Sequence, residues 1–122
     1  MSDRQGVGRR GEELAARYLQ ELGLTVIDRN VRMAWGEIDL VARQGDELVF
    51  VEVKTRIGDQ STAPDEIVGV GKLARLERMS AAYVERLGDP DVDWRVDVVA
   101  VVIGRDGRVV RIDHVPGAFL DS

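Results

Sequence analysis

The stretch ELVFVEVKTR, at positions 47–56, constrains the fold of this chain more than any other. It is apolar on both alternating faces for most of its length, which is typical of a strand in the centre of a sheet. Glu52 and Lys54 break the pattern near its end. Removing two such ions from water costs several kcal/mol per ion unless they are well paired. The stretch therefore predicts a central strand that ends in a charged pair, and this pair needs an explanation.

The rest of the chain is predicted to surround this strand as one domain. Its length of 122 residues is close to the commonest domain size. Residues 1–10 are rich in glycine and arginine and are expected to form a flexible arm. Residues 11–120 are then expected to form the domain itself.

Hydrophobic periodicity predicts the other elements. Apolar residues recur at helical spacing from Leu14 to Leu22 and from Ile67 to Tyr83, and Pro64 suits the first turn of the second helix. Further strands are expected at 24–30, 37–43, 94–103 and 108–115. The order α-β-β-β-α-β-β indicates an α/β fold with one mixed five-stranded sheet flanked by helices.

Composition excludes several kinds of site. The chain has no cysteine and a single histidine, which excludes disulfides, thiolate chemistry and a zinc site built on Cys and His. Any metal would have oxygen ligands. No apolar run approaches the roughly 20 residues of a membrane-spanning helix, and the N-terminus lacks the pattern of a secretory signal. We therefore expect a cytoplasmic protein without a membrane partner.

The net charge of −5 also limits the function. Proteins that coat nucleic acid non-specifically are more often basic. An enzyme with a local basic rim remains compatible with this charge, because the distribution of charge matters more than its sum.

The charged end of the central strand is best explained together with Asp39. A tight turn at Gly45 and Asp46 should make the strand at 37–43 an antiparallel neighbour of the central one, which places Asp39 beside Glu52. Side chains two apart in a strand share a face, so Lys54 should lie next to both. Adjacent carboxylates repel each other, and one of them tends to keep a proton unless a cation intervenes.

This arrangement predicts a metal site with a catalytic lysine. Asp39 and Glu52 offer hard oxygen ligands that suit Mg²⁺ or Mn²⁺. Lys54 would orient or activate a water for attack on phosphorus, or offset charge in the transition state. The alternative is a plain surface ion pair, worth about 0–1 kcal/mol. The position at the end of an apolar strand, with Asp39 one hairpin away, favours the functional interpretation.

These residues carry a family resemblance. GEIDLVAR followed by FVEVKTR resembles the signature of the PD-(D/E)XK, or restriction-endonuclease-like, nucleases, with Asp39 as the first carboxylate and Glu52 and Lys54 as its E-x-K. The chain departs from the superfamily name in having Ile38, not proline, before Asp39. It is more closely similar to the small bacterial YraN-like family of uncharacterised proteins, from GRRGEELAARYL to RVDVVAV.

The resemblance implies further properties. It implies a restriction-endonuclease-like fold and a metal site, and it relates the chain to archaeal-type Holliday-junction resolvases. Resolvase-like members carry a glutamate on the first helix that approaches the metal, and Glu12 matches that position. A favourable interaction of this carboxylate with the helix dipole, worth about 0.3–1 kcal/mol, is the alternative. A homodimer is expected, since two symmetric cuts need two sites.

Basic residues suggest where nucleic acid would bind. Lys72, Arg75 and Arg78 recur every three residues on the second predicted helix, where such a stripe could contact phosphates. A solvated helix face is the alternative. Arg9 and Arg10 could hold a phosphate backbone, although terminal arms are often simply disordered.

Two further carboxylates receive structural interpretations. Glu37 shares a strand face with Asp39 and is interpreted as a rim charge. Asp97 lies in an apolar strand and is interpreted as a structural aspartate, paired with Arg95 or a backbone donor.

Two main functions of different class follow, and a third, weaker hypothesis is a protein-interaction domain that uses the acidic segment 85–93. The first is a Mg²⁺- or Mn²⁺-dependent endonuclease that acts on DNA, in particular branched or otherwise structured DNA. The second is a nucleic-acid-binding or scaffold module that keeps the nuclease-like fold without turnover. The set of Asp39, Glu52 and Lys54 favours the first, and the acidic balance of the chain favours the second.

Overall fold

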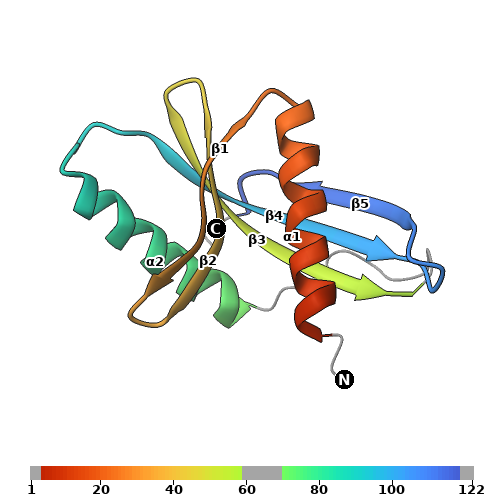
Figure 1. Ribbon diagram of the computed structural model, residues 1–122. Coiled ribbons are helices and arrows are strands. Elements are labelled where there is room, and N and C mark those ends of the chain that lie inside the picture. The colour runs from red at the N-terminus through yellow and green to blue at the C-terminus, as the bar shows by residue number, and fades with distance from the viewer. Residues whose placement is uncertain (1–3, 59–69, 119–122) are drawn as a thin grey trace.

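The computed structural model, which describes residues 4–58 and 70–118, has one five-stranded sheet with a helix on each face (Figure 1). The elements are α1 (Arg4–Glu21), β1 (Thr25–Met33), β2 (Gly36–Gln44), β3 (Glu47–Ile57), α2 (Val70–Leu87), β4 (Trp94–Ile103) and β5 (Val109–Val115). The strands lie in the order β1-β2-β3-β4-β5. Only β3 and β4 pair in parallel, so the sheet is mixed. The predicted fold class and element order are confirmed.

Alternate side chains of the central strand serve two separate cores. On one face, Val49, Val51 and Val53 pack with Ala15 and Leu19 of α1. On the other face, the remaining apolar side chains of β3 pack with those of α2; they are Leu48 and Phe50 with Leu76 and Met79. This period of two explains why the sequence of β3 is apolar on both faces.

The first helix differs from the prediction at its start. It begins at Arg4, so residues 4–10 are helical and do not form the predicted flexible arm. Farther along, the helix approaches β3 closely at Gly11. A Cβ added at Gly11 would lie 2.8 Å from the Cβ of Thr55, so only a glycine lets the helix cross β3 here. Val7, one helical turn earlier, lines a cleft together with Ile57. Residues 4–10 thus continue the helix although several of them have weak helix propensity.

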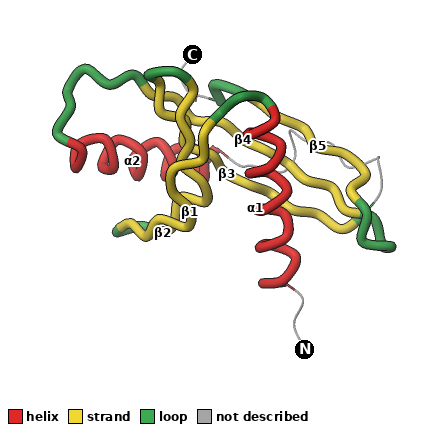
Figure 2. The backbone as a smooth tube through the Cα atoms, turned by 45° about the horizontal axis from the view of Figure 1, so that its top comes forward, coloured by secondary structure: helices red, strands yellow, loops and turns green. Residues whose placement is uncertain are grey.

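The sheet divides at β2, and this division creates the site. The pairing of β2 with β3 ends at Leu40 and Val51, whereas β3 runs on to Ile57 beside β4. The first residues of β2 continue to pair with β1. Figures 1 and 2 show β1 and β2 turning away from the direction of β3, β4 and β5. Beyond Val51, the edge of β3 therefore no longer pairs with β2. We call the point where these two strands diverge the fork of the sheet.

Asp97 has the structural role that the sequence suggests. It is completely buried, and its carboxylate accepts hydrogen bonds from Arg95 Nε at 2.9 Å and from the backbone N–H of Gly117 at 2.9 Å. His114 Nε2 lies 2.8 Å from its other oxygen, and Tyr18 lies on the far side of the imidazole. This network joins β4 to β5 and to α1.

Some predictions concern residues outside the described ranges. Pro64 and the start of the second helix before Val70 belong to this group, as do residues 119–120 of the predicted domain. In the part of the chain that the structure describes, no helix is both long and apolar enough to cross a membrane.

Candidate catalytic cleft

Asp39 lies at the fork between β2 and β3. Its Oδ2 accepts a hydrogen bond from the backbone N–H of Val53 at 2.8 Å. The last paired residues of this ladder are Leu40 and Val51, so Asp39 and Glu52 occupy the next position along the two strands. The strand register thus brings together the two carboxylates that the hairpin argument placed side by side.

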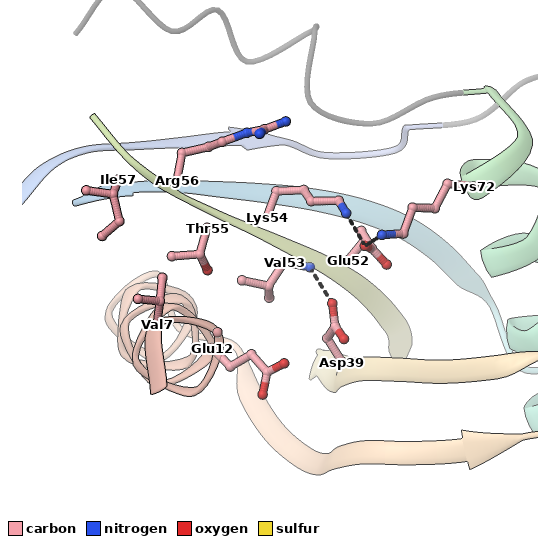
Figure 3. Close-up of a pocket in the computed structure, with 11 residues that line it drawn as sticks. Val7, Glu12, Asp39, Glu52, Val53, Lys54, Thr55, Arg56, Ile57 and Lys72 are labelled. Atoms are coloured by element: carbon pink, nitrogen blue, oxygen red, sulfur yellow. Dashed lines mark hydrogen bonds and ion pairs between the residues drawn. The ribbon is translucent and has the colours of Figure 1, made fainter. Parts of the chain in front are cut away.

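Glu52 is the centre of the charged cluster. Its side chain is only 8% exposed, and its Oε2 lies 3.6 Å from Lys54 Nζ and 3.1 Å from Lys72 Nζ. Figure 3 shows the two lysine side chains converging on this carboxylate from β3 and α2. The expected pair of Glu52 and Lys54 is present, and the first turn of α2 adds a second cation to it.

Glu12 reaches the same cleft from α1. Figure 3 shows its side chain pointing toward Asp39, and its charge contributes to raising the pKa of Asp39. Asn30 of β1 donates hydrogen bonds from Nδ2 to Glu12 at 3.0 Å and to Glu37 at 3.2 Å. Glu12 is therefore held toward the cleft by a partner on another element.

Asn30 is a site residue that the sequence reasoning missed. Its φ of 50° is positive, and asparagine is among the few residues that tolerate this conformation. It lies between Arg29 and Val31, whose partners Leu40 and Ile38 flank Asp39. Asn30 is the last residue of the strand predicted at 24–30, but it lies inside the observed β1, where asparagine is uncommon.

The electrostatics of the cleft reflect crowded like charges. Burial raises the pKa of Asp39 to about 7, and the charges of Glu52 and Glu12 add to the effect against the Val53 hydrogen bond. Burial and the neighbouring Lys72 lower the pKa of Lys54. Burial acts to lower the pKa of Lys72. The hydrogen bond of Lys72 with Lys54 and the charge of Glu52 outweigh the effect of burial, so the pKa of Lys72 is raised. Lys54 is thus the cation that loses its proton more readily.

These groups line one open cleft of about 640 Å³. Its walls are α1, β3 and α2, with Asp39 from β2 at the fork. Within residues 4–58 and 70–118, no set of three or more Asp, Glu or His side chains is gathered closely enough to chelate a metal ion. The available donors are the carboxylates of Asp39 and Glu52. Such a pair suits Mg²⁺, which commonly binds through one or two carboxylates and keeps several waters.

The predicted phosphate-binding arginines lie in different settings. Arg75 borders a hollow next to the carboxylates. Arg10 donates a hydrogen bond to the backbone carbonyl of Gly107 at 2.7 Å, so its guanidinium ties α1 to the turn between β4 and β5. Arg9 is exposed on α1. Of these residues, only Arg75 lies in the same group of side chains as Asp39 and Glu52.

Comparison with known proteins assigns the chain to a family. The sequence model of the uncharacterised protein family UPF0102 matches residues 11–101. The chain belongs to the UPF0102 family. A UPF0102 protein of Rhodococcus jostii is 46% identical over 122 residues, which cover 98% of this chain and 100% of the relative. A UPF0102 protein of Symbiobacterium thermophilum is 48% identical over 113 residues, covering 93% and 95% of the two chains. One from Pelotomaculum thermopropionicum is 41% identical over 116 residues, covering 95% and 97%.

Membership of UPF0102 confirms the resemblance to the YraN-like family. The similarity is not restricted to the motif around Glu52, because the relatives match this chain over nearly its whole length. The matched range of 11–101 contains all six charged residues that line the cleft, which are Glu12, Asp39, Glu52, Lys54, Arg56 and Lys72. Of the lining residues, only Val7 and Gly8 lie outside the part of the chain that the family model of this UPF0102 protein matches.

Proposed function

We propose that this UPF0102 protein is a metal-dependent endonuclease that hydrolyses phosphodiester bonds in DNA. One observation carries the proposal: two carboxylates and two lysines from three elements meet in one cleft at the end of the central strand. Burying a carboxylate beside other carboxylates destabilises a fold; burial, followed by the charge of Glu52, raises the pKa of Asp39. A purely structural role does not explain why the protein keeps carboxylates in this destabilising arrangement.

Asp39 and Glu52 would hold Mg²⁺ or Mn²⁺. The ion would supply Lewis-acid polarisation of a phosphate oxygen and offset its charge. Asp39 contributes an oxygen that is already oriented by the backbone of Val53. Glu12 lies on α1, on the opposite wall of the cleft, and its side chain adds negative charge next to Asp39. The donor chemistry fits a hard divalent cation, because every side-chain donor is an oxygen.

The two lysines can divide the remaining work. Lys54 has the lowered pKa, so its amine is the better group to accept a proton from, or to orient, an attacking water. Lys72 has the raised pKa and remains charged, which suits contact with a non-bridging phosphate oxygen. The different surroundings of these two ammonium groups support different roles for them.

A second candidate is a nucleic-acid-binding module without turnover. One observation favours it: Glu52 is already paired with two ammonium groups, and the described residues form no metal-chelating set of three. Such a module would use Lys72 and Arg75 for phosphates and would bind DNA equally well without divalent metal.

Cleavage assays with matched variants distinguish the candidates. The substrates are single-stranded, duplex, flap and four-way DNA with Mg²⁺ or Mn²⁺. We expect Asp39→Asn and Lys54→Ala each to lower the rate about a hundred- to a thousand-fold, by analogy with the loss of one transition-state stabiliser. Asp46→Asn, in the turn at the opposite end of the same hairpin, is the control and should cut normally.

Stability provides the second readout. Because removing one crowded carboxylate relieves repulsion, Asp39→Asn should melt at or above the wild-type temperature in the absence of metal. Mg²⁺ or Mn²⁺ should raise the melting temperature of the wild type by mass action. The endonuclease proposal fails if no form cuts any substrate and both variants melt well below the wild type. Sedimentation with and without four-way DNA would test the expected homodimer.

A further inference from the structure

An exposed tryptophan lies at the tip of the β1–β2 hairpin. Trp35 is 53% exposed, and it is the only aromatic side chain among the described residues that is exposed. The other tryptophan, Trp94, packs edge-on against Phe50 with ring centroids 5.7 Å apart. The tip is seated on α2, since a Cβ at Gly36 would lie 3.6 Å from the sulfur of Met79. Figure 1 shows the tip beside this helix.

Three cations of α2 line the same hollow as this indole. Trp35, Gly71, Lys72, Arg75 and Arg78 line one hollow of about 450 Å³. Arg75 and Arg78 are exposed. Among residues 4–58 and 70–118, neither arginine forms an ion pair. Their charge is therefore available to an anionic partner, whereas the charge of Lys72 is shared with Glu52.

This hollow is continuous with the candidate catalytic cleft. A second hollow of about 280 Å³ is lined by both Trp35 and Arg75 and also by Asp39 and Glu52. A ligand resting on the indole would thus extend to the two carboxylates. The tryptophan, the cations and the acidic site form one surface that spans the hairpin tip, α2 and the fork of the sheet.

We infer that this surface binds an unpaired stretch of DNA and leads it to Asp39 and Glu52. The inference rests on the proposed function and specifies its substrate class. An indole face can stack on any base, and such stacking is worth about 1–3 kcal/mol per base. Bases within a duplex are already stacked on both sides, so only an unpaired base offers Trp35 a free face. Arg75 and Arg78 are placed to contact the phosphates of the same strand.

The geometry favours a short unpaired segment over a long one. Trp35 is a single platform, whereas proteins that coat long single strands stack successive bases on several aromatic residues. A flap, gap or branch point presents a few unpaired bases beside a duplex and matches one platform next to a cleft. An anionic membrane surface is the other partner that an indole with neighbouring cations can attract. The acidic residues in the adjoining hollow favour a strand over a flat anionic surface.

Binding measured without divalent metal tests the inference separately from cleavage. A labelled single strand and the blunt duplex of the same sequence are titrated in EDTA and followed by anisotropy and tryptophan quenching. We expect the single strand to bind more tightly and to quench the indole fluorescence. Trp35→Ala should weaken this binding about five- to a hundred-fold, which corresponds to the loss of one stacked base. Trp35→Phe should retain most of it.

Control variants isolate the contribution of the surface. Leu87→Ala removes a side chain of similar exposure, 51%, from the far end of α2 and should leave affinity unchanged. Arg75→Ala and Arg78→Ala should each lower the salt dependence of strand binding by about 0.7 in the log–log slope. Arg86→Ala, at the last turn of the same helix, should not.

Three outcomes would overturn the inference: equal affinity for the blunt duplex, unchanged single-strand affinity in Trp35→Ala, or Trp35-dependent binding to anionic vesicles with none to DNA. Cleavage in Mn²⁺ is scored independently on the same preparations. Strand binding that depends on Trp35 without any cleavage would support this surface and overturn the endonuclease proposal. Cleavage by a Trp35→Ala variant that binds the strand with wild-type affinity would support the endonuclease proposal and overturn the role of this surface.

Discussion

At the scale of single residues, the cleft contains charged side chains whose burial lowers the stability of the folded protein. Asp39 is the clearest case, because burial and the neighbouring Glu52 raise its pKa to about 7. Glu52 is paired with both Lys54 and Lys72. Asn30 uses a left-handed backbone to hold Glu12 and Glu37. A bound cation, as in the proposed function, would reduce the repulsion among these carboxylates.

The raised pKa of Asp39 predicts how stability depends on pH. In the folded protein the pKa is about 7, against 3.8 for the ordinary side chain, so the folded state holds a proton that the unfolded state has lost. In metal-free buffer this contribution to stability should be complete below about pH 4 and should be lost as the pH rises to about 7. Asp39→Asn should flatten this part of the stability curve.

Denaturant unfolding in EDTA from pH 4 to 8 measures this effect. The difference in free energy of unfolding between Asp39→Asn and the wild type should grow with pH in favour of the variant. Asp46→Asn supplies the control, with an exposed carboxylate in the turn of the same hairpin. A wild-type curve that rises through this window to the same extent as that of Asp39→Asn would contradict the assigned electrostatics.

At the scale of secondary elements, the site depends on how closely α1 approaches β3. Gly11 allows this approach, because any side chain there would overlap that of Thr55. The next residue on the helix is Glu12, so the contact also sets the distance of this carboxylate from the fork. The contact therefore links the packing of one helix to the charge distribution of the cleft.

Gly11→Ala tests this link. We expect it to destabilise the protein by about 1–3 kcal/mol, as overpacking of a close contact does, although alanine is the better helix former. Gly8→Ala lies in the same helix with no atom within 4 Å of the added Cβ, and should be neutral or stabilising by up to about 1 kcal/mol. Chemical denaturation compares the two.

A second substitution identifies the cause of the Gly11→Ala effect. Adding Thr55→Ala should recover part of the loss, since the two side chains compete for the same space. Equal stability of the Gly11→Ala and Gly8→Ala variants would show that α1 can shift away from β3 at little cost. In that case the position of Glu12 would not depend on this contact.

At the scale of the whole molecule, Asp97 connects elements that are far apart in the sequence. Arg95 reaches from it to Gln44 and Glu47 at the β2–β3 turn, both at 2.8 Å. His114 links it to β5 and, through Tyr18, to α1. The network lies away from the cleft, among residues that do not line it. It therefore supports the sheet that carries the site without taking part in the site itself.

Asp97→Ala should cost on the order of 3–5 kcal/mol, because it removes a fully buried carboxylate and leaves a half-buried arginine and the other partners without it. Asp113→Ala is a matched control on β5. It removes an aspartate paired with an arginine two residues earlier, but with a side chain that is 26% exposed, and should cost about 0–1 kcal/mol. Thermal and denaturant melts of the two variants measure the difference. Similar small losses would contradict a structural role for the network.

The sequence alone determined the elements and the central carboxylates. Both are local or nearly local properties. The alternation of side chains in 47–56 defines a strand buried on both faces, and the short turn before this strand defines the register that places Asp39 beside Glu52. The pairing of Glu52 with Lys54 follows from the same alternation. Asp97 was recognisable as structural because an isolated charge in an apolar strand must find a partner.

Only the tertiary structure decided what surrounds these residues. Helix α1 begins at Arg4, and its close approach to Thr55 at Gly11 is a contact that no local propensity reveals. Lys72 reaches Glu52, and Trp35 lies next to Arg75, only because α2 crosses the sheet at the fork. Such contacts join residues far apart in the chain, and the angle at which each helix crosses the sheet sets them. That angle is fixed by the packing of whole faces, which periodicity in the sequence does not specify.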